Sequence, residues 1–330
     1  MSNQPSRPAL TDLLSSARVV SLPLRTRFRG VVDREVMLFE GPNGWAEWSP
    51  FLEYPDEEAA VWLAAAIEFG FGALPEIRRE AIPVNATLPA VTPDQVEKVL
   101  ARFGNFSTVK IKVAEPGQTI AEDLARVRRV HELHPEVAIR LDANGGFDVE
   151  TAIELAKELA LESIDLQYFE QPVKTIGELA EVRFKLARIG IKVAADESVR
   201  KASDPLAVAN ANAADVLVIK AQPLGGIRSA LDITREARLP VTVSSALETS
   251  VGISMGLHLA AALDVESFDA GLGTVALLAD DVCEEPFIAE NGLLYVKRAV
   301  ASETKLSQLA ADSERTDWWL ARLERCYNLI

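Results

Sequence analysis

A unit of one strand followed by one helix recurs from residue 83 to residue 273, and this recurrence limits the possible folds more than any other feature. Short runs rich in β-branched residues alternate with amphipathic stretches such as residues 120–133 and 149–161. The runs are residues 83–88, 108–113, 137–144, 164–172, 192–198, 215–220, 240–248 and 267–273. Eight units in series favour a closed barrel over an open doubly wound sheet, and no GxGxxG or GxxxxGK[ST] motif follows the first runs to support the open sheet.

The two ends of the chain show a different pattern. The segments with strand character are residues 17–30, 31–41 and 291–299, and those with helical character are residues 56–71 and 312–329. Asp56 is expected to be the N-cap of its helix. We predict that residues 1–82 and 286–330 form an α+β capping domain over a barrel of residues 83–285. The expected fold class is therefore α/β, a TIM-like barrel with a cap made from both chain ends.

The charge balance narrows the range of partners. The chain has 49 acidic and 34 basic residues, a formal net charge of −15, which argues against nucleic acids and anionic membrane surfaces. Cys283 and Cys326 are too few for a disulfide framework or a cysteine-rich zinc site. The sequence shows neither a signal peptide at the N-terminus nor a stretch of ~20 apolar residues. We therefore expect a cytoplasmic protein of enzyme size that binds a small molecule.

Two lysines lie in the second run, residues 108–113. Strand alternation places Val109, Ile111 and Val113 on one face and Lys110 and Lys112 on the other. In a barrel the apolar face packs against helices, so both lysines would point inward near the end of the strand. Neighbouring lysines in a low-dielectric interior lower each other's pKa, which would prepare one of them as a base. The alternative is an exposed edge strand with solvated lysines.

Three carboxylates end the next three runs. Asp142 and Glu170 are 28 residues apart and Glu170 and Asp196 are 26 apart, each about one unit, so the three would meet at one mouth of the barrel. Such a cluster of like charges is costly unless a cation holds it. Oxygen ligands favour a hard divalent ion, with Mg²⁺ first. The alternative is that each acid merely caps the following helix.

Lys220 ends the sixth run and would lie on the far side of the carboxylates from Lys112. It could also simply pair with Asp196 or Glu197. Lysines on both sides of a metal-bound carboxylate suit removal of the proton next to that carboxylate, because a metal ion and an ammonium group stabilise the enediolate while a second lysine takes the proton.

At these residues the sequence resembles the enolase superfamily in its muconate-lactonising branch. The resemblance rests on the KxK run at Lys110 and Lys112, the three acids in order, and Lys220, and it covers essentially the whole chain. Within the branch it is most similar to the o-succinylbenzoate synthase family of menaquinone biosynthesis, through RTRFRG at 25–30 and GLGTVALLADDV at 271–282. The resemblance implies a (β/α)7β barrel with a capping domain.

The resemblance also implies a reaction, the dehydration of 2-succinyl-6-hydroxy-2,4-cyclohexadiene-1-carboxylate to 2-succinylbenzoate. The three acids would hold Mg²⁺, or Mn²⁺ in its place, and the metal would bind the ring carboxylate of this small substrate. Lys112 would remove the α-proton and return it to the leaving hydroxyl group, and Lys110 would tune the pKa of Lys112. Lys220 would stabilise the enediolate through a cation–π contact.

Weaker signals mark possible substrate contacts at the ends of other runs. Asn85 and Asn144 would either touch substrate or satisfy backbone groups. Ser244, with its neighbours in SSALE at 244–248, is either a substrate contact typical of the family or part of an ordinary turn. Gly271 would leave room and free backbone N–H groups beside the eighth run.

Three arginines alternate in RTRFRG, at positions 25, 27 and 29. They would share one face of a strand or an extended loop. The strip, with Arg27 at its centre, either attracts the distal succinyl carboxylate of the substrate or is a solvated basic face.

Other reactions of the superfamily share the same core residues. N-succinylamino acid racemisation and muconate cycloisomerisation remain alternatives. Dipeptide epimerases carry an Asp-x-Asp at the eighth strand, where this chain reads Asp269, Ala270 and Gly271, which weakens that alternative. A metal-free binding protein that kept the barrel is the alternative from another functional class.

Overall fold

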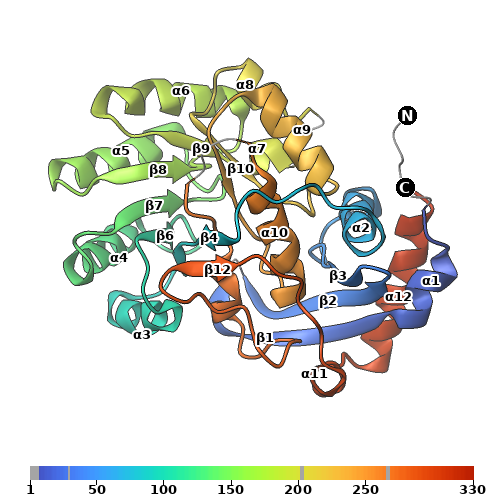
Figure 1. Cartoon of the computed structure of the whole chain (residues 1–330). Helices are drawn as coiled ribbons and strands as arrows, with labels where there is room; N and C mark the ends of the chain where they lie inside the picture. The colour runs from blue at the N-terminus through green and yellow to red at the C-terminus, as the bar shows by residue number, and fades with distance from the viewer. Residues whose placement is uncertain (1–6, 29, 201–203, 265–267) are drawn as a thin grey trace.

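The barrel predicted from the repeating unit is present in the computed structural model, which describes residues 7–28, 30–200, 204–264 and 268–330 (Figure 1). Seven parallel strands form one sheet in the order β11-β10-β9-β8-β7-β6-β5. Their bounds are β5 Ala86–Leu88, β6 Thr108–Lys112, β7 Ala138–Asp142, β8 Leu166–Glu170, β9 Val193–Ala195, β10 Val216–Ile219 and β11 Val241–Val243.

The eighth run closes the ring without forming a regular strand. Ala270 forms a parallel bridge to Val84, next to β5, and Gly271 forms one to Ser244, just after β11. The segment 268–273 thereby joins β5 and β11, the two edge strands of the sheet. The predicted α/β barrel is confirmed.

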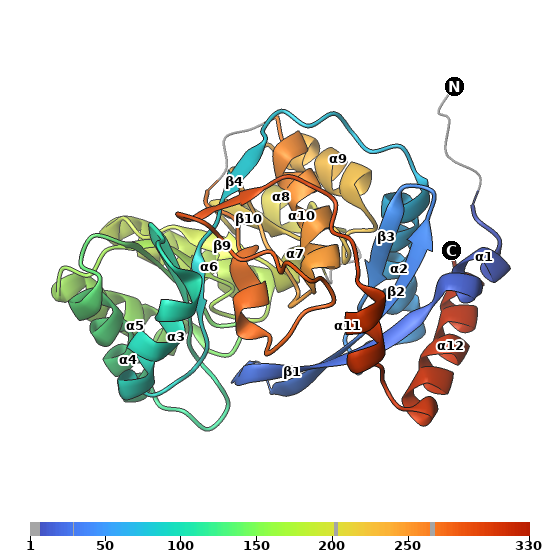
Figure 2. The same ribbon diagram turned by 60° about the horizontal axis from the view of Figure 1, so that its bottom comes forward.

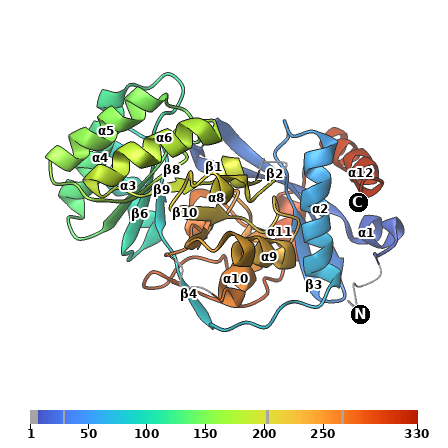
Figure 3. The ribbon, with the colours of Figure 1, turned by 90° about the horizontal axis from the view of Figure 1, so that it is seen from above.

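Helices cover the outside of the sheet (Figure 3). Their bounds are α3 Val96–Leu100, α4 Ile120–Leu133, α5 Val149–Leu161, α6 Ile176–Leu186, α8 Ala207–Asn210, α9 Ile227–Ala237 and α10 Ser250–Ala262. The short α7 Glu197–Arg200 directly follows the end of β9, and its Arg200 donates to the cap residue Tyr54. Reciprocal hydrogen bonds between Thr119 and Glu122 begin α4, and those between Thr175 and Glu178 begin α6. The Asp148 side chain caps α5. These local signals explain why α4 and α5 have the predicted bounds.

The cap contains a three-stranded antiparallel sheet in the order β1-β2-β3. Its strands are β1 Arg18–Phe28, β2 Val31–Gly41 and β3 Gly44–Trp48, and β3 was not predicted. Gly41 pairs with Gly44 across the turn, and Gly44 has a φ of 99°, a conformation that favours glycine. Figure 2 shows β1 and β2 extending from the cap helices toward the barrel.

Both chain ends contribute helices to the cap. These are α1 Leu10–Ser16, α2 Asp56–Phe71, α11 Glu303–Gln308 and α12 Ser313–Tyr327. The rings of Trp48 and Trp319 meet edge to face with centroids 5.2 Å apart, which joins the cap sheet to α12. The prediction that Asp56 caps α2 is wrong: Pro55 holds the N-cap position, and the Asp56 carboxylate instead accepts from Arg325 Nε at 2.6 Å.

The C-terminal segment forms a two-stranded sheet with β4 Ala81–Pro83 before it reaches the cap. The predicted strand at 291–299 is only β12 Leu293–Tyr295, which pairs with β4. Short 3-10 helices complete the fold at Pro93–Gln95, Ala101–Phe103, Ala187–Ile189 and Gly273–Leu277. One continuous hydrophobic cluster includes buried residues of both cap and barrel, and the domain boundaries at 82 and 286 stay predictions. No helix in the described ranges has the length and apolar character needed to span a membrane.

Candidate active site

The two lysines of β6 lie inside the barrel. Lys110 and Lys112 each expose only 6% of their surface, while Val109, Ile111 and Val113 are buried against the helices. The alternative of an exposed edge strand is therefore wrong, because β6 lies between β5 and β7 in the sheet.

Lys110 bridges two of the carboxylates. Its Nζ lies 3.0 Å from Asp142 Oδ2 and 3.1 Å from Glu170 Oε1. Burial lowers the pKa of Lys110, but the charges of Asp142 and Glu170 outweigh burial and raise the pKa above its ordinary value. The acids across the sheet, which strand alternation alone does not reveal, therefore set the net direction of the pKa of Lys110. That each lysine lowers the pKa of the other stays a prediction.

Lys112 is held at the end of β6. Its Nζ donates to Asp142 Oδ2 at 2.5 Å and to Asn144 Oδ1 at 2.7 Å, and lies 5.1 Å from the centre of the Phe28 ring. Asn144 also donates from Nδ2 to Glu197 Oε1 at 3.1 Å. The amide of Asn144 thus orients the lysine rather than only satisfying backbone groups.

The three carboxylates lie at the ends of three neighbouring strands, as unit spacing predicts. Asp142 and Glu170 are register partners on β7 and β8, Asp196 directly follows β9, and all three are buried. Asp142 and Glu170 are not helix caps, because Asp148 and Thr175 cap the helices that follow them. The capping alternative is wrong for both.

The protonation of these carboxylates differs. Burial, reinforced by the charge of Asp142, raises the pKa of Glu170 to about 7. Burial also disfavours ionisation of Asp142, but Lys110 and Lys112 hold its pKa well below the usual range. For Asp196, the charges of Lys220 and Arg200 outweigh burial and lower the pKa.

Lys220 lies on the opposite side of the carboxylates from Lys112. Its Nζ donates to Asp196 Oδ2 at 2.6 Å, and Arg200 Nε donates to Asp196 Oδ1 at 3.0 Å. Lys220 is 5% exposed, so its side chain is inside the barrel. Lys220 thus both pairs with Asp196 and flanks the cluster.

The donor set of the cluster fits a hard divalent ion. Across the described ranges, no three His, Cys, Asp or Glu side chains are grouped closely enough to hold a metal ion. Lys110 Nζ lies between Asp142 and Glu170. All donors are carboxylate oxygens, which Mg²⁺ prefers. Burial first, and then the charges of Asp142 and Asp196, raise the pKa of Glu170, and a positive charge beside the cluster would oppose these effects.

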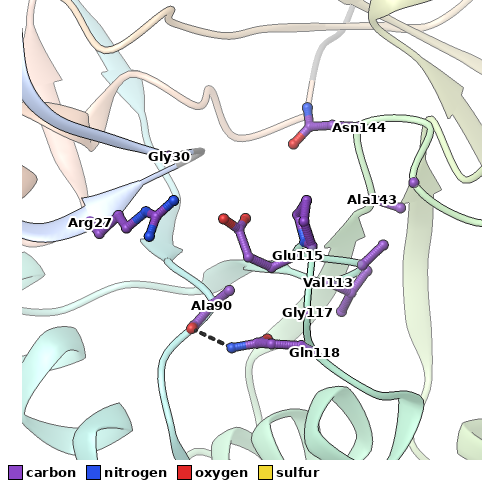
Figure 4. A pocket seen from close by; sticks show the side chains of 12 residues that line it. Arg27, Gly30, Ala90, Val113, Glu115, Gly117, Gln118, Ala143 and Asn144 are labelled. Atoms are coloured by element: carbon purple, nitrogen blue, oxygen red, sulfur yellow. Dashed lines mark hydrogen bonds between the residues drawn. The ribbon is translucent and has the colours of Figure 1, made fainter.

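A cavity of about 20 Å³, which we call the lysine cavity, lies beside these groups. Its lining residues are Phe28, Phe51, Thr87, Lys110, Lys112, Asp142, Asn144, Lys220, Ser244, Ser245, Ala246, Leu247, Gly271 and Thr274. A larger cavity of about 510 Å³ lies between the end of β1, with Gly30 just before β2, and the loop that follows β6 (Figure 4). Asn144 lines both cavities, and Arg27 and Glu115 line the larger one. We place the chemistry in the smaller cavity because the lysines are there.

Most of the predicted substrate contacts line one of the two cavities. Ser244 and Gly271 line the lysine cavity, and a Cβ on Gly271 would lie 2.6 Å from Ser244 Oγ, so a side chain at this position would displace the serine hydroxyl. Asn85 lines neither cavity: its Nδ2 donates to Ala86 O, and its Oδ1 accepts from Arg140 Nη1. Of the two alternatives for Asn85, contact with substrate or satisfaction of backbone groups, the structure therefore favours the second.

The arginine strip is only partly at the mouth. Arg27 lines the larger cavity, and its guanidinium forms no ion pair with any residue that the structure describes. Arg25 turns away and donates to the carbonyls of Leu278 and Ala279. Arg29 lies outside the described residues.

Several lining residues were not predicted. Thr87 is two residues after Asn85, so strand alternation places both on the same face, and Thr87 lies closer to the end of β5. The reasoning that points to Asp142, an inward polar residue at the end of its strand, therefore points to Thr87 as well. Phe28 and Phe51 come from the cap. Phe28 lies within RTRFRG, where only the arginines are predicted to contact substrate, and Phe51 carries no sequence signal of a site, because apolar residues are common in any core.

The comparisons agree over almost the whole chain. Residues 92–300 match the family described as enolase C-terminal domain-like, and residues 19–70 match enolase N-terminal domain-like. An o-succinylbenzoate synthase of Mycobacterium marinum (strain ATCC BAA-535 / M) is 50% identical over 326 residues, which cover 99% of this chain and 98% of the relative. One from Mycobacterium tuberculosis (strain ATCC 25618 / H37Rv) is 48% identical, with the same coverage of 99% and 98%.

Solved structures show the same fold. The muconate lactonizing enzyme from Pseudomonas fluorescens, complexed with muconolactone, superposes with a TM-score of 0.75 at 19% identity, over 90% of this chain and 98% of that one. The L-Ala-D/L-Glu epimerase from Bacillus subtilis gives a TM-score of 0.72 at 22% identity, over 86% and 96%. At these identities the two structures establish the architecture alone.

Proposed function

The chain belongs to the enolase superfamily, and from this premise we propose that it dehydrates 2-succinyl-6-hydroxy-2,4-cyclohexadiene-1-carboxylate to 2-succinylbenzoate, a step of menaquinone biosynthesis. The observation that carries the proposal is the pair of buried lysines, Lys112 and Lys220, on opposite sides of the carboxylate cluster. Relatives at 50% identity over nearly the full length support the same reaction.

Lys112 acts as the base in this proposal. Once neutral, its amine accepts the proton from the carbon next to the ring carboxylate. The resulting ammonium then donates that proton to the departing hydroxyl group on the same face, so that one water molecule leaves and the ring becomes aromatic. Asn144 Oδ1 and Asp142 Oδ2 hold the Nζ in place between these steps.

Lys110 and Lys220 act through charge. The ammonium of Lys110 remains protonated between Asp142 and Glu170 and tunes Lys112 through the shared Asp142. Lys220 stabilises the negative charge of the enediolate from the other side. Asp142, Glu170 and Asp196 would hold Mg²⁺, which when bound supplies positive charge for the substrate carboxylate.

The succinyl arm is the part of the substrate that the cap and neighbouring loops recognise. We place its carboxylate beside Arg27 in the larger cavity, where the guanidinium forms no ion pair with a described residue. Its ring would lie against Lys112, Ser244 and Gly271, where it must widen the lysine cavity of about 20 Å³. Asn144 lines both cavities and so marks where the ring ends and the arm begins.

N-succinylamino acid racemisation is the second candidate, because opposed lysines also suit proton removal and return on opposite faces. Dipeptide epimerisation is less well supported. The Asp269 carboxylate accepts from Ser107 Oγ and Thr108 Oγ1, at the start of β6 and therefore at the other end of the barrel from Lys112. It is not placed to hold a substrate ammonium group.

We also propose a cytoplasmic location, because Cys283 and Cys326 are both free, buried thiols, as a reducing compartment permits. The net charge of −15 is unfavourable for nucleic-acid binding.

A direct comparison of substrates tests the function. Purified protein with Mg²⁺ is assayed with the cyclohexadiene and, separately, with N-succinylamino acids, and kcat/KM is compared. We expect dehydration to be the faster reaction. Faster racemisation would make the racemase the main activity, and the absence of both reactions would refute the proposed function.

A further inference from the structure

One wall of the lysine cavity is a loop in a costly conformation. The loop at residues 244–249 joins β11 to α10, and its residues Ser244 to Leu247 line the cavity. Leu247 has a φ of 66°, in the left-handed region that non-glycine residues rarely adopt. Such a conformation persists only where surrounding contacts hold it.

Those contacts come largely from the cap, through a buried arginine on β2. Arg34 is 2% exposed, and it donates from Nε to Leu247 O and from Nη2 to Ala246 O, both at 3.3 Å. The same Nη2 also donates to Ser49 O. The guanidinium lies 4.5 Å from the centre of the Phe51 ring, which lines the cavity from the cap side.

The barrel side of the loop is held by a carboxylate. Glu248 accepts from the backbone N–H of Ala246 at 2.5 Å and from Gln222 Nε2 at 3.4 Å, and Gln222 Oε1 accepts from Ser49 N at 3.1 Å. Burial lowers the pKa of Arg34, while the nearby charges of Glu47 and Glu248 oppose that effect. The arginine is thus a buried charge placed between two walls of one cavity.

We propose that Arg34 is a positioning and specificity-determining residue, which locks the 244–249 loop of the barrel to the 49–51 segment of the cap and so sets the shape of the lysine cavity. The inference rests on the proposed function only in treating this cavity as the substrate site. Arginine is needed because a single planar group reaches four carbonyls, those of Glu35, Ser49, Ala246 and Leu247, and stacks on Phe51. A lysine ammonium is a single point of charge.

The test is Arg34→Met, with Arg298→Met as the matched control. Arg298 also donates to two cap carbonyls, of Trp45 and Phe69, and stacks on an aromatic ring at 3.8 Å, but it lines neither cavity. We expect Arg34→Met to raise KM for the cyclohexadiene about tenfold or more, with a smaller loss in kcat, because two loop carbonyls lose their donors. Mg²⁺ affinity, measured by calorimetry, should stay within about twofold of wild type in both variants.

A second measurement does not depend on turnover. Hydrogen–deuterium exchange should become faster in residues 244–249 and 49–51 of Arg34→Met and remain as in wild type in Arg298→Met. If Arg34→Met does not fold, Arg34→Lys takes its place, with the same exchange pattern and a smaller rise in KM.

Two outcomes would overturn the role of Arg34: unchanged exchange and KM in its variants, or the same KM rise in Arg298→Met. The proposed function fails separately, when wild type neither dehydrates the cyclohexadiene nor binds 2-succinylbenzoate. In that case the exchange result still decides whether Arg34 holds the loop.

Discussion

The barrel and the cap contribute different kinds of group to the same cavity. The barrel supplies charges, with Lys112 on one side of the carboxylate cluster and Lys220 on the other. The cap supplies shape, through the rings of Phe28 and Phe51 and the buried Arg34 behind them. Substitutions in the barrel should therefore reduce the rate of the chemical step, and substitutions in the cap should mainly weaken substrate binding.

Removal of the metal ion should reduce turnover the most. The carboxylate cluster that would hold the ion belongs wholly to the barrel, which supplies the charges for the chemical step. We expect EDTA to abolish dehydration and Mg²⁺ or Mn²⁺ to restore it. Asp196→Asn should weaken Mg²⁺ binding at least about tenfold by calorimetry. Full activity in chelator, or Mg²⁺ binding equal to wild type in Asp196→Asn, would contradict the metal site.

Lys112→Ala should reduce dehydration by roughly 10³-fold or more, since a positioned general base contributes on this scale. Exchange of the α-proton in D₂O should be lost together with turnover, because both need the same proton transfer. NMR of the recovered substrate measures the exchange. Retained exchange would show that another group is the base.

Lys220→Ala should lower kcat by about 10²-fold, because one charge that stabilises the enediolate is lost. Mg²⁺ affinity should change far less than turnover, since Asp196 keeps its second partner, Arg200. Steady-state kinetics and calorimetry on the same preparation separate these effects. Unchanged turnover would remove Lys220 from the mechanism.

Arg27→Ala tests the cap side of the comparison. We expect KM to rise about tenfold with little change in kcat, which corresponds to the loss of one charge-assisted hydrogen bond to the succinyl carboxylate. Arg25→Ala is the control, because its side chain turns toward the carbonyls of Leu278 and Ala279. Equal KM values in wild type and Arg27→Ala would leave Arg27 as a surface residue.

The smallest expected effect is on the pH dependence of the free energy of unfolding, and it arises from a carboxylate where the cap meets the barrel. Burial raises the pKa of Glu47 to about 7, and its carboxylate accepts from Thr249 N and Gly252 N at the start of α10. Because the folded pKa lies above the unfolded value, the folded state binds more protons, and stability should fall as pH rises from about 5 to 7.

The free energy of unfolding should fall by up to about 1.4 kcal/mol per pH unit, and this fall is the slope to be measured. Urea unfolding at several pH values should show a smaller slope for Glu47→Gln than for wild type. Glu40→Gln, at an exposed position on β2, is the control and should keep the wild-type slope. Identical slopes in all three proteins would contradict the raised pKa.

The sequence predicted the charged side of the cavity well, because the relevant geometry is local. Strand alternation determines which face Lys110 and Lys112 occupy, and one unit of spacing carries Asp142 to Glu170 on the neighbouring strand. Applied to β5, the same rule selects Thr87, which lines the lysine cavity, whereas Asn85 accepts from Arg140. It also could not predict the raised pKa of Lys110, which depends on acids from two other strands.

By itself, the sequence determined the barrel, the order of its charged strand ends and the chemistry that those groups permit, since parallel strands in repeated units bring equivalent positions to one rim. Only the tertiary structure decided which cap residues meet that rim. Phe28, Arg34 and Phe51 lie more than 190 residues before the 244–249 loop that they face. No periodic pattern encodes a contact over that distance, because it depends on how two separately patterned regions pack against each other.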